Sequence, residues 1–274
     1  MKIFLMTDME GVAGVLNFRD WVFPDGRYYD RGKRLLTLEV NAVIDGFCAA
    51  GAAEVLVCDG HGPGGIDPEL LDERAELMRG APRPVWPFGL DRSCDAIACV
   101  GQHAKAGTPF SHMTHTENLA MIDLTVNGLS IGEYGRIALC AMELGIPAIF
   151  AAGEDAFARE AEALTPGVIT VGVKHGLLVD GLDSLSAEEY ERAKLSAVHL
   201  PPAKARKLLR AGAFAAVRKF QETPECFRYP ELHPPYTIEL RMRHDAHHEK
   251  SRILRQHHPS SLIGALNAPS ETQS

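Results

Sequence analysis

The chain has 274 residues, of which 46% are hydrophobic and 23% are charged, and its net charge is −8. A chain of this length and composition can bury a full hydrophobic core, as globular proteins do. The acidic charge argues against a broad nucleic-acid-binding surface, and no apolar run reaches the roughly 20 residues that a membrane helix needs. We therefore expect neither nucleic acid nor a membrane among its partners.

The six cysteines lie mostly within apolar runs, and none of them belongs to a C-x-x-C pair. This pattern predicts buried, reduced thiols rather than a disulfide framework or a zinc finger. The apolar run at the start of the chain ends before Asp8, which leaves no room for the apolar region of a signal peptide. Together these features predict a cytoplasmic protein.

The first 155 residues alternate short apolar runs with amphipathic stretches, which is the pattern of βα units around a mainly parallel sheet. Residues 2–7 form the first predicted strand, and a long helix with apolar residues at helical spacing then ends at Gly51. Asn127 and Gly128 predict the turn of a hairpin. Further strands are expected in EVLVCDGHG, CDAIACVGQHA and IPAIFAAGED, and further helices in YGRIALCAMELG and AFAREAEALTPG.

The last third of the chain is less regular. We expect a strand in VITVGVKHG, helices in SAEEYERAKL and PPAKARKLLRAGAFAAVRKF, a half-buried strand in YTIELRMR, and a frayed end in APSETQS. The whole pattern predicts three α/β/α layers with a mainly parallel central sheet and a smaller C-terminal α+β lobe. A soft boundary would separate a core, residues 1–160, from a lobe packed on it, residues 161–274.

Side chains that can bind metal ions follow several of the predicted strands. The carboxyl ends of parallel strands meet at one edge of a sheet, where open α/β sheets bind their ligands. The side chains are Asp8 and Glu10 after the first strand, Asp59 and His61 after the second, His103 after the third, and Glu133 at the end of the hairpin. The sequence therefore predicts that several of these groups converge.

Asp8 and Glu10 stand two residues apart, so in an extended chain they face the same way. Two carboxylates held so close beside apolar surface resist ionisation unless a cation compensates their charge. A helix cap or a solvated turn is the alternative for this motif alone. Because similar groups recur after several strands and no thiolate is among them, the set favours a metal site, which suits zinc and would also accept manganese, iron or cobalt.

A loop rich in Gly, Pro, Ser and Thr carries His112 and His115 shortly after His103. Such a loop can cover a metal centre and supply a general acid or base, because a histidine titrates near neutral pH. The alternative is an exposed loop with two solvated histidines.

Eight stretches resemble, in the same order, the zinc-dependent, self-compartmentalising D-aminopeptidases of the bacterial dipeptide-operon type. They are TDMEGVAGV, YYDRGKRLLTLEVNAVI, AAEVLVCDGHG, GQHAKAGTP, HMTHT, VNGLSIGEYG, IPAIFAAGEDAFAREAEALTPGV and PPAKARKLL. The stretches span residues 1 to about 210, and the resemblance fades beyond about residue 225.

This resemblance implies a centre of two zinc ions per subunit, with Asp8 as the carboxylate that bridges them and His115 as the catalytic histidine. His112 is the alternative, because the loop is one residue longer than the family pattern. The resemblance also implies short peptide substrates, a preference for D-residues, and a ring-shaped homo-oligomer, a decamer. The implied zinc ligands are Asp8, Glu10, His61, His103 and Glu133.

Other functions are compatible with parts of this pattern. A different two-metal amidohydrolase or esterase would use the same centre, and a non-catalytic protein would bind metal or a small molecule there. A nucleotide-binding protein is disfavoured, because neither glycine-rich turn has the G-x-G-x-x-G pattern or the lysine of a phosphate loop. Near the C-terminus, His244, His247 and His248 have helical spacing, for which a solvated, charged helix is favoured over a metal site.

Overall fold

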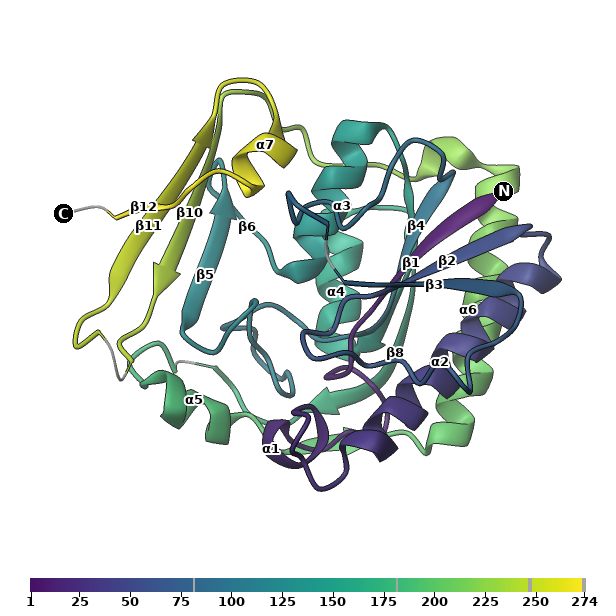
Figure 1. Ribbon diagram of the computed structural model, residues 1–274, viewed down its shortest axis with the longest axis horizontal. Coiled ribbons are helices and arrows are strands. Elements are labelled where there is room, and N and C mark those ends of the chain that lie inside the picture. Colours follow the sequence, from purple (N-terminus) through teal and green to yellow (C-terminus); the bar gives the residue numbers. More distant parts are fainter. Residues whose placement is uncertain (81, 181, 246–247, 273–274) are drawn as a thin grey trace.

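The fold is built on a large sheet with helices on both faces and a second, smaller sheet beside it (Figure 1). The structure is a computed structural model that describes residues 1–80, 82–180, 182–245 and 248–272. The large sheet contains β1 (Lys2–Thr7), β2 (Glu54–Asp59), β3 (Ala75–Arg79), β4 (Ala96–Gln102), β7 (Ala148–Glu154), β8 (Ile169–Gly176) and β9 (Ala197–His199). Its strand order is β3-β2-β1-β4-β7-β8-β9, and only the β8–β9 pair is antiparallel.

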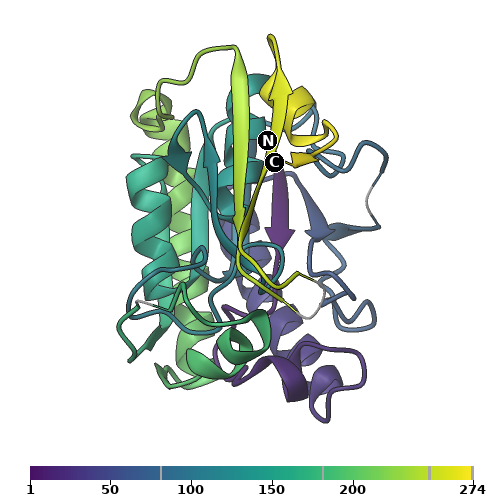
Figure 2. The same cartoon turned by 90° about the vertical axis from the view of Figure 1, so that its left-hand side faces the viewer.

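The small sheet is antiparallel and faces the viewer in Figure 2. It contains β5 (Met121–Val126), β6 (Leu129–Ser130), β10 (Tyr236–Met242), β11 (Arg252–His258) and β12 (Glu271–Thr272), in the order β12-β11-β10-β5-β6. The predicted hairpin at Asn127 and Gly128 joins β5 to β6, and both turn residues have the positive φ that such a turn needs. The hairpin therefore supplies two strands to a sheet whose other strands come from the end of the chain.

Helices cover the large sheet on both faces (Figure 1). The helices in the described residues are α1 (Phe18–Trp21), α2 (Tyr29–Ala49), α3 (Glu133–Leu144), α4 (Asp155–Leu164), α5 (Ala187–Ala193), α6 (Pro202–Glu222) and α7 (Leu262–Leu266), with a 3₁₀ turn at Pro224–Cys226, and α7 packs on the small sheet. The α2 and α6 helices pack together on one face, and α3 and α4 pack on the other. A Cβ atom on Gly46 of α2 would lie 2.4 Å from the carbonyl oxygen of Arg210 in α6, so glycine is required at this crossing.

The alternation of side chains along β1 divides the core into two halves. Ile3 and Leu5 pack beneath α2 and α6, whereas Phe4 and Met6 pack toward α3 and the small sheet. All four side chains are buried, because β1 lies in the middle of the sheet and is covered on both faces. This buried strand fixes the position of the loop that follows it.

The predicted α/β class, with a mainly parallel central sheet and a smaller additional part, is confirmed. The sequence did not predict β3, β9, β11, α1 or α7. The frayed end was a wrong expectation for Glu271 and Thr272, which pair with β11. The division into residues 1–160 and 161–274 stays a prediction.

The predicted helix around His244 and His248 is wrong for the residues that the structure describes there, since Asp245 and His248 form a β-bridge. His248 Nδ1 lies 3.0 Å from Asp245 Oδ1. His247 lies outside the described residues. In the described parts of the chain, no helix has both the length and the hydropathy needed to cross a membrane.

Candidate metal centre

Four neighbouring segments bring the predicted ligands together at the carboxyl edge of the large sheet. Strand β1 lies between β2 and β4, so the loops that follow these three strands meet. Asp8 directly follows β1, His61 comes two residues after β2, and His103 directly follows β4. Glu10 lies in the loop after β1, and Glu133 is the first residue of α3. These five residues converge, as the sequence predicted, whereas Asp59 bonds to its own loop.

Asp59 organises its own loop rather than joining the cluster. Both of its carboxylate oxygens accept hydrogen bonds from the backbone N–H of Gly65, at 2.9 and 3.0 Å, and one also accepts from Ile66 at 3.2 Å. The residue shapes the glycine-rich turn that carries His61.

Asp8 lies between two histidines. Its Oδ1 atom is 3.1 Å from His61 Nδ1, and its Oδ2 atom is 3.3 Å from His103 Nε2. Each histidine also faces a second carboxylate, because His61 Nδ1 is 3.3 Å from Glu10 Oε2 and His103 Nε2 is 3.5 Å from Glu133 Oε1. The cluster thus has two halves that share Asp8.

The donor atoms in this cluster fit a divalent metal ion. Glu10 Oε2 and His103 Nε2 are buried, and neither makes a hydrogen bond to any residue that the structure describes. The other ring nitrogen of each histidine donates to a carbonyl oxygen, His61 Nε2 to Val22 at 2.9 Å and His103 Nδ1 to Ala104 at 2.9 Å. Metal-binding histidines are typically oriented in this way. Imidazole nitrogens with carboxylate oxygens are a donor set that zinc accepts.

The charges in the cluster shift the pKa values of its members strongly. Burial alone lowers the pKa of His61 and His103, but the charges of Glu10 and Glu133 outweigh it and hold both imidazole pKa values well above their usual range. Burial alone raises the carboxyl pKa values, but contact with the histidines lowers the pKa of Asp8 and brings that of Glu133 to about 2. Protons on the imidazoles therefore balance the carboxylates, and a bound metal ion would replace them.

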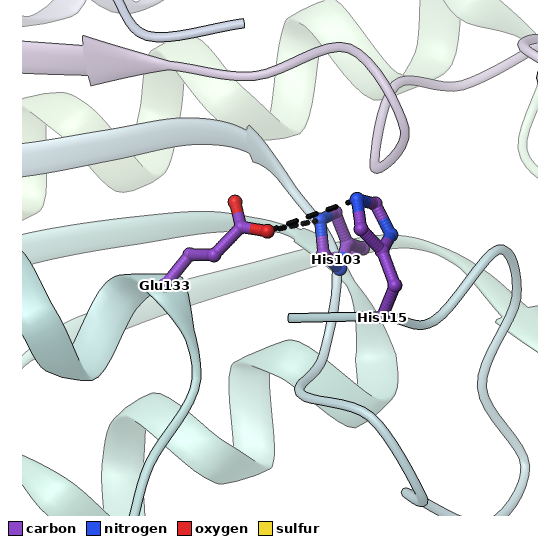
Figure 3. Close-up of side chains that lie close together, drawn as sticks. All are labelled: His103, His115 and Glu133. Atoms are coloured by element: carbon purple, nitrogen blue, oxygen red, sulfur yellow. Dashed lines mark ion pairs between the residues drawn. The ribbon is translucent and has the colours of Figure 1, made fainter. Parts of the chain in front are cut away.

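His115 lies against this cluster (Figure 3). Its ring stacks on that of His103, with centroids 4.0 Å apart, and its Nε2 atom is 3.7 Å from Glu133 Oε1. Its Nδ1 atom is 3.1 Å from the carbonyl oxygen of Met113, so this nitrogen carries the proton and Nε2 is free to accept one. The nearest ligand atoms of His103, His115 and Glu133 all lie within 4.8 Å of one another. The position of His115 Nε2 is therefore compatible with two roles, as a proton acceptor or as a metal ligand.

His112 occupies a different environment from His115. It is fully buried, its Nε2 atom is 3.2 Å from the carbonyl oxygen of Leu16, and its ring packs edge-on against His199. Burial, with the nearby charge of Lys174, lowers the pKa of His112 to about 2. A permanently neutral, enclosed imidazole of this kind is suited to packing rather than to proton transfer.

Gln102 is a residue of the site that the sequence reasoning missed. Its Nε2 atom donates to Asp8 Oδ2 at 2.9 Å and to Glu133 Oε2 at 3.2 Å, so it links the two segments that bear these carboxylates. Gln102 is the last residue of β4 and is polar in an otherwise apolar, fully buried strand. That position was the signal that could have identified it.

Glu154 and Lys174 were also missed, although Glu154 ends β7, Lys174 lies two residues before the end of β8, and the two are register partners. Glu154 accepts hydrogen bonds from the backbone N–H groups of Ala104 at 2.7 Å and His112 at 2.6 Å. The Nζ atom of Lys174 donates to the carbonyl oxygen of Glu10. These two buried side chains therefore hold the backbone of two loops: Lys174 holds the loop with Glu10, and Glu154 holds the loop with His103 and His115.

Three comparisons with known proteins point to one family. Residues 1–258 match the model of a protein family described as D-aminopeptidase. A D-aminopeptidase of Bacillus subtilis (strain 168) is 34% identical over 190 residues, which cover 68% of each chain. The solved structure of a Zn-dependent D-aminopeptidase, DppA from Bacillus subtilis, described as a self-compartmentalizing protease, superposes with a TM-score of 0.77 at 27% identity. That match covers 89% of this chain and 82% of the other.

The family match spans most of the chain and includes every residue of the cluster described above. We conclude that the chain belongs to the D-aminopeptidase family of peptidases.

Proposed function

We propose that this protein hydrolyses the amino-terminal residue, with a preference for D-amino acids, from short peptides and amides at a centre of two zinc ions per subunit. The observation that carries the proposal is the position of Asp8, one oxygen of which faces His61 while the other faces His103. A carboxylate shared in this way suits the two-metal sites of hydrolases. The family description and the zinc-dependent relative support both the activity and the metal.

The proposed zinc ligands form two groups that share one member. Asp8 with Glu10 and His61 would hold one ion, and Asp8 with His103 and Glu133 would hold the other. Bound zinc supplies Lewis-acid chemistry, which polarises a carbonyl group and stabilises negative charge that develops on it. Gln102 keeps Asp8 and Glu133 oriented through its two hydrogen bonds.

We assign the proton transfer to His115. Its Nδ1 proton is held by the carbonyl of Met113, so Nε2 faces the cluster as a proton acceptor. A histidine in this position can take a proton from an attacking water molecule and return it to the departing amine. The side chain is 12% exposed, which leaves it accessible from the cavity while Phe18 packs edge-on against its ring.

The proposal extends to assembly and location. We infer a ring-shaped homo-oligomer, a decamer by family resemblance, in the cytoplasm. The description of the related structure as a self-compartmentalizing protease supports assembly. Active sites enclosed by such an assembly would admit only short, flexible peptides, and light scattering on the purified protein would measure the number of subunits.

The experiment that tests the activity is a panel of D- and L-aminoacyl amides and dipeptides, assayed before and after treatment with a chelator. We expect the D-substrates to be hydrolysed faster, chelation to abolish turnover, and added zinc to restore it. Zinc analysis should find two equivalents per chain. Cleavage of esters or acylated amides in preference to free-amine substrates would favour another amidohydrolase or esterase. Zinc binding with no turnover of any substrate would refute an enzymatic role.

A further inference from the structure

The cavity that contains the metal cluster also contains a group of apolar side chains. Its volume is about 810 Å³, which is at the upper end of the roughly 300–1,000 Å³ usual for small-ligand pockets. We use the name apolar wall for the cavity-lining side chains Val85, Trp86, Phe88, Leu240 and Leu266. A dinuclear centre needs only polar ligands, so the apolar wall calls for a separate explanation.

The apolar wall is connected to the metal cluster through two side chains. The backbone N–H of Glu117 donates to Glu133 Oε1 at 2.7 Å, and the Glu117 carboxylate pairs with the guanidinium of Arg136. The Cζ atom of Arg136 lies 5.4 Å from the centre of the Trp86 ring. A substrate held at the metal cluster is therefore within reach of the apolar wall.

The aromatic part of the apolar wall has a defined shape. Trp86 and Phe88 pack edge to face, with ring centroids 4.9 Å apart and an interplanar angle of 83°. Phe88 has a φ of 57°, in the left-handed region that a bulky side chain rarely adopts. Strain of this kind tends to occur where a protein positions a ligand. Phe88 keeps a partly exposed ring in the cavity, whereas Trp86 is 6% exposed and forms the base beneath it.

Asn267 fixes Trp86 from the C-terminal side. The backbone N–H of Trp86 donates to Asn267 Oδ1 at 3.0 Å, and Asn267 Nδ2 donates back to the carbonyl oxygen of Trp86 at 2.9 Å. Asn267 directly follows α7, which is itself anchored to α3, because Glu143 accepts hydrogen bonds from Ser261 Oγ at 2.7 Å and from the N–H of Ile263 at 2.9 Å. Figure 1 shows α7 beside the upper end of α3.

The segment that contains α7 and Asn267 lies after residue 258, where the match to the family model ends. The metal cluster is thus formed by the family-matched part of the chain, whereas part of the apolar wall is not. A feature of this kind can distinguish the substrates of this protein from those of its relatives.

We propose that the apolar wall is a subsite for a bulky apolar side chain of the peptide substrate, and that Asn267 is a positioning residue that sets the shape of the subsite by holding Trp86. The proposal rests on the proposed peptidase function. A bulky apolar side chain gains binding free energy in the subsite because it leaves water and contacts the aromatic rings. A glycine or alanine substrate leaves the same surface uncovered.

Two pairs of substrates test the subsite and locate it relative to the cleaved bond. The first pair is D-phenylalaninamide and D-alaninamide, and the second is D-alanyl-D-phenylalanine and D-alanylglycine. We expect kcat/KM to be about tenfold higher for the phenylalanine member of at least one pair, the discrimination that a hydrophobic pocket usually gives. Equal kcat/KM values within both pairs would overturn the proposal.

Variants of the wall show whether that preference arises there. Phe88→Ala and Asn267→Ala should each lower the phenylalanine preference about tenfold, mainly by raising KM for the phenylalanine substrate. The control is Asn127→Ala, because Asn127 makes a similar pair of backbone bonds, from Thr237 N–H at 2.8 Å and to the carbonyl of His233 at 2.9 Å, and does not line the cavity. An equal loss of preference in the control variant would assign the effect to general destabilisation and refute the role of Asn267.

Fluorescence gives a readout that is independent of turnover. The chain has two tryptophans, Trp21 and Trp86, so Trp21→Phe leaves Trp86 as the only one. Free D-phenylalanine, a product of both phenylalanine substrates, should change the emission of Trp86 saturably, and D-alanine should not. A saturable response without hydrolysis of any substrate would refute the peptidase function and retain the subsite. Hydrolysis of the substrates with identical fluorescence responses to D-phenylalanine and D-alanine would refute the subsite and retain the peptidase function.

Discussion

The ring of His115 stacks on the ring of His103 at an interplanar angle of 15°, and both residues lie in the loop between β4 and β5. His103 directly follows the buried strand β4, whereas His115 lies farther along, in an irregular part of that loop. The stack therefore holds the His115 ring against His103, whose position the sheet fixes. In the roles proposed for these two residues, the stack would orient the proton acceptor against the metal ligand before the substrate arrives.

Replacing His115 by Ala should remove turnover without removing metal. We expect kcat to fall by about 10²- to 10⁴-fold, the usual contribution of a general acid or base. Metal analysis of the purified variant should still find the wild-type amount of zinc. A variant that loses one zinc equivalent would instead make His115 a ligand, and one that retains turnover would exclude it from proton transfer.

Replacing Asp8 by Ala should remove metal and activity together, because both halves of the cluster depend on this carboxylate. Asp123→Ala is a suitable control, since Asp123 also accepts a side-chain hydrogen bond, from Ser130 Oγ at 2.6 Å, but lies on β5 outside the cluster. Zinc content and turnover of the control should equal those of the wild type. A fully metallated and active Asp8 variant would contradict the proposed centre.

Replacing Glu154 by Gln should displace the loop that carries His103 and His115, because Glu154 holds the backbone of this loop. The amide group of Gln would turn an N–H donor toward one of two backbone N–H groups that now donate to Glu154. An unsatisfied buried donor costs about 1–3 kcal/mol, so we expect a lower unfolding temperature and a reduced kcat.

The matched comparison for this variant is Glu160→Gln, since Glu160 Oε2 accepts a single backbone bond, from Lys105 at 2.8 Å. Gln at position 160 keeps an oxygen for that single bond, so the larger losses of stability and of kcat should both belong to Glu154→Gln. Equal kcat values in the two variants would show that Glu154 stabilises the fold without orienting the loops.

Glu39 should make the stability of the protein depend on pH. Burial raises the pKa of its carboxyl to about 8, while the N–H of Ala13 and the charge of Lys174 act in the opposite direction. The ordinary carboxyl pKa is 4.5, so between these two values the folded protein holds a proton that the unfolded chain has released. The free energy of unfolding contributed by this group therefore falls as the pH rises through that window.

Thermal unfolding of the wild type and of Glu39→Gln measures this contribution. Gln keeps an oxygen for the Ala13 N–H and cannot ionise, so the variant should gain stability relative to the wild type between about pH 5 and about pH 9. A difference in unfolding temperature that stays constant over this range would show that Glu39 does not titrate in it.

Much of the large sheet was predictable from the sequence because its strands are apolar along their whole length. The predicted strand at residues 2–7 coincides with β1, and the long helix that was expected to stop at Gly51 ends at Ala49. In contrast, β3 and β11 have mostly half-exposed side chains and many charges, so no apolar pattern marks them. Each is placed by pairing with the strand before it in the chain, β3 with β2 and β11 with β10, and not by an apolar pattern of its own.

The cluster could be predicted because the carboxyl ends of parallel strands meet at one edge of the sheet, so polar residues that follow several strands come together there. That rule was applied to the first strands only, although Glu154 satisfies it at the end of β7 and its register partner Lys174 lies two residues before the end of β8. The apolar wall follows no such rule, because Trp86 meets Asn267 only after the C-terminal segment has folded back over α3. Contacts of this kind arise from the tertiary arrangement and leave no mark on either segment alone.

Lys174 is 2% exposed, and its ammonium group is enclosed beneath the loop that carries Glu10. An amine-reactive reagent can modify this lysine only when the end of β8 separates from that loop. The speed of its acylation, followed by mass spectrometry against the exposed Lys204, Lys207 and Lys250 of the same sample, therefore reports how often this edge of the native molecule opens.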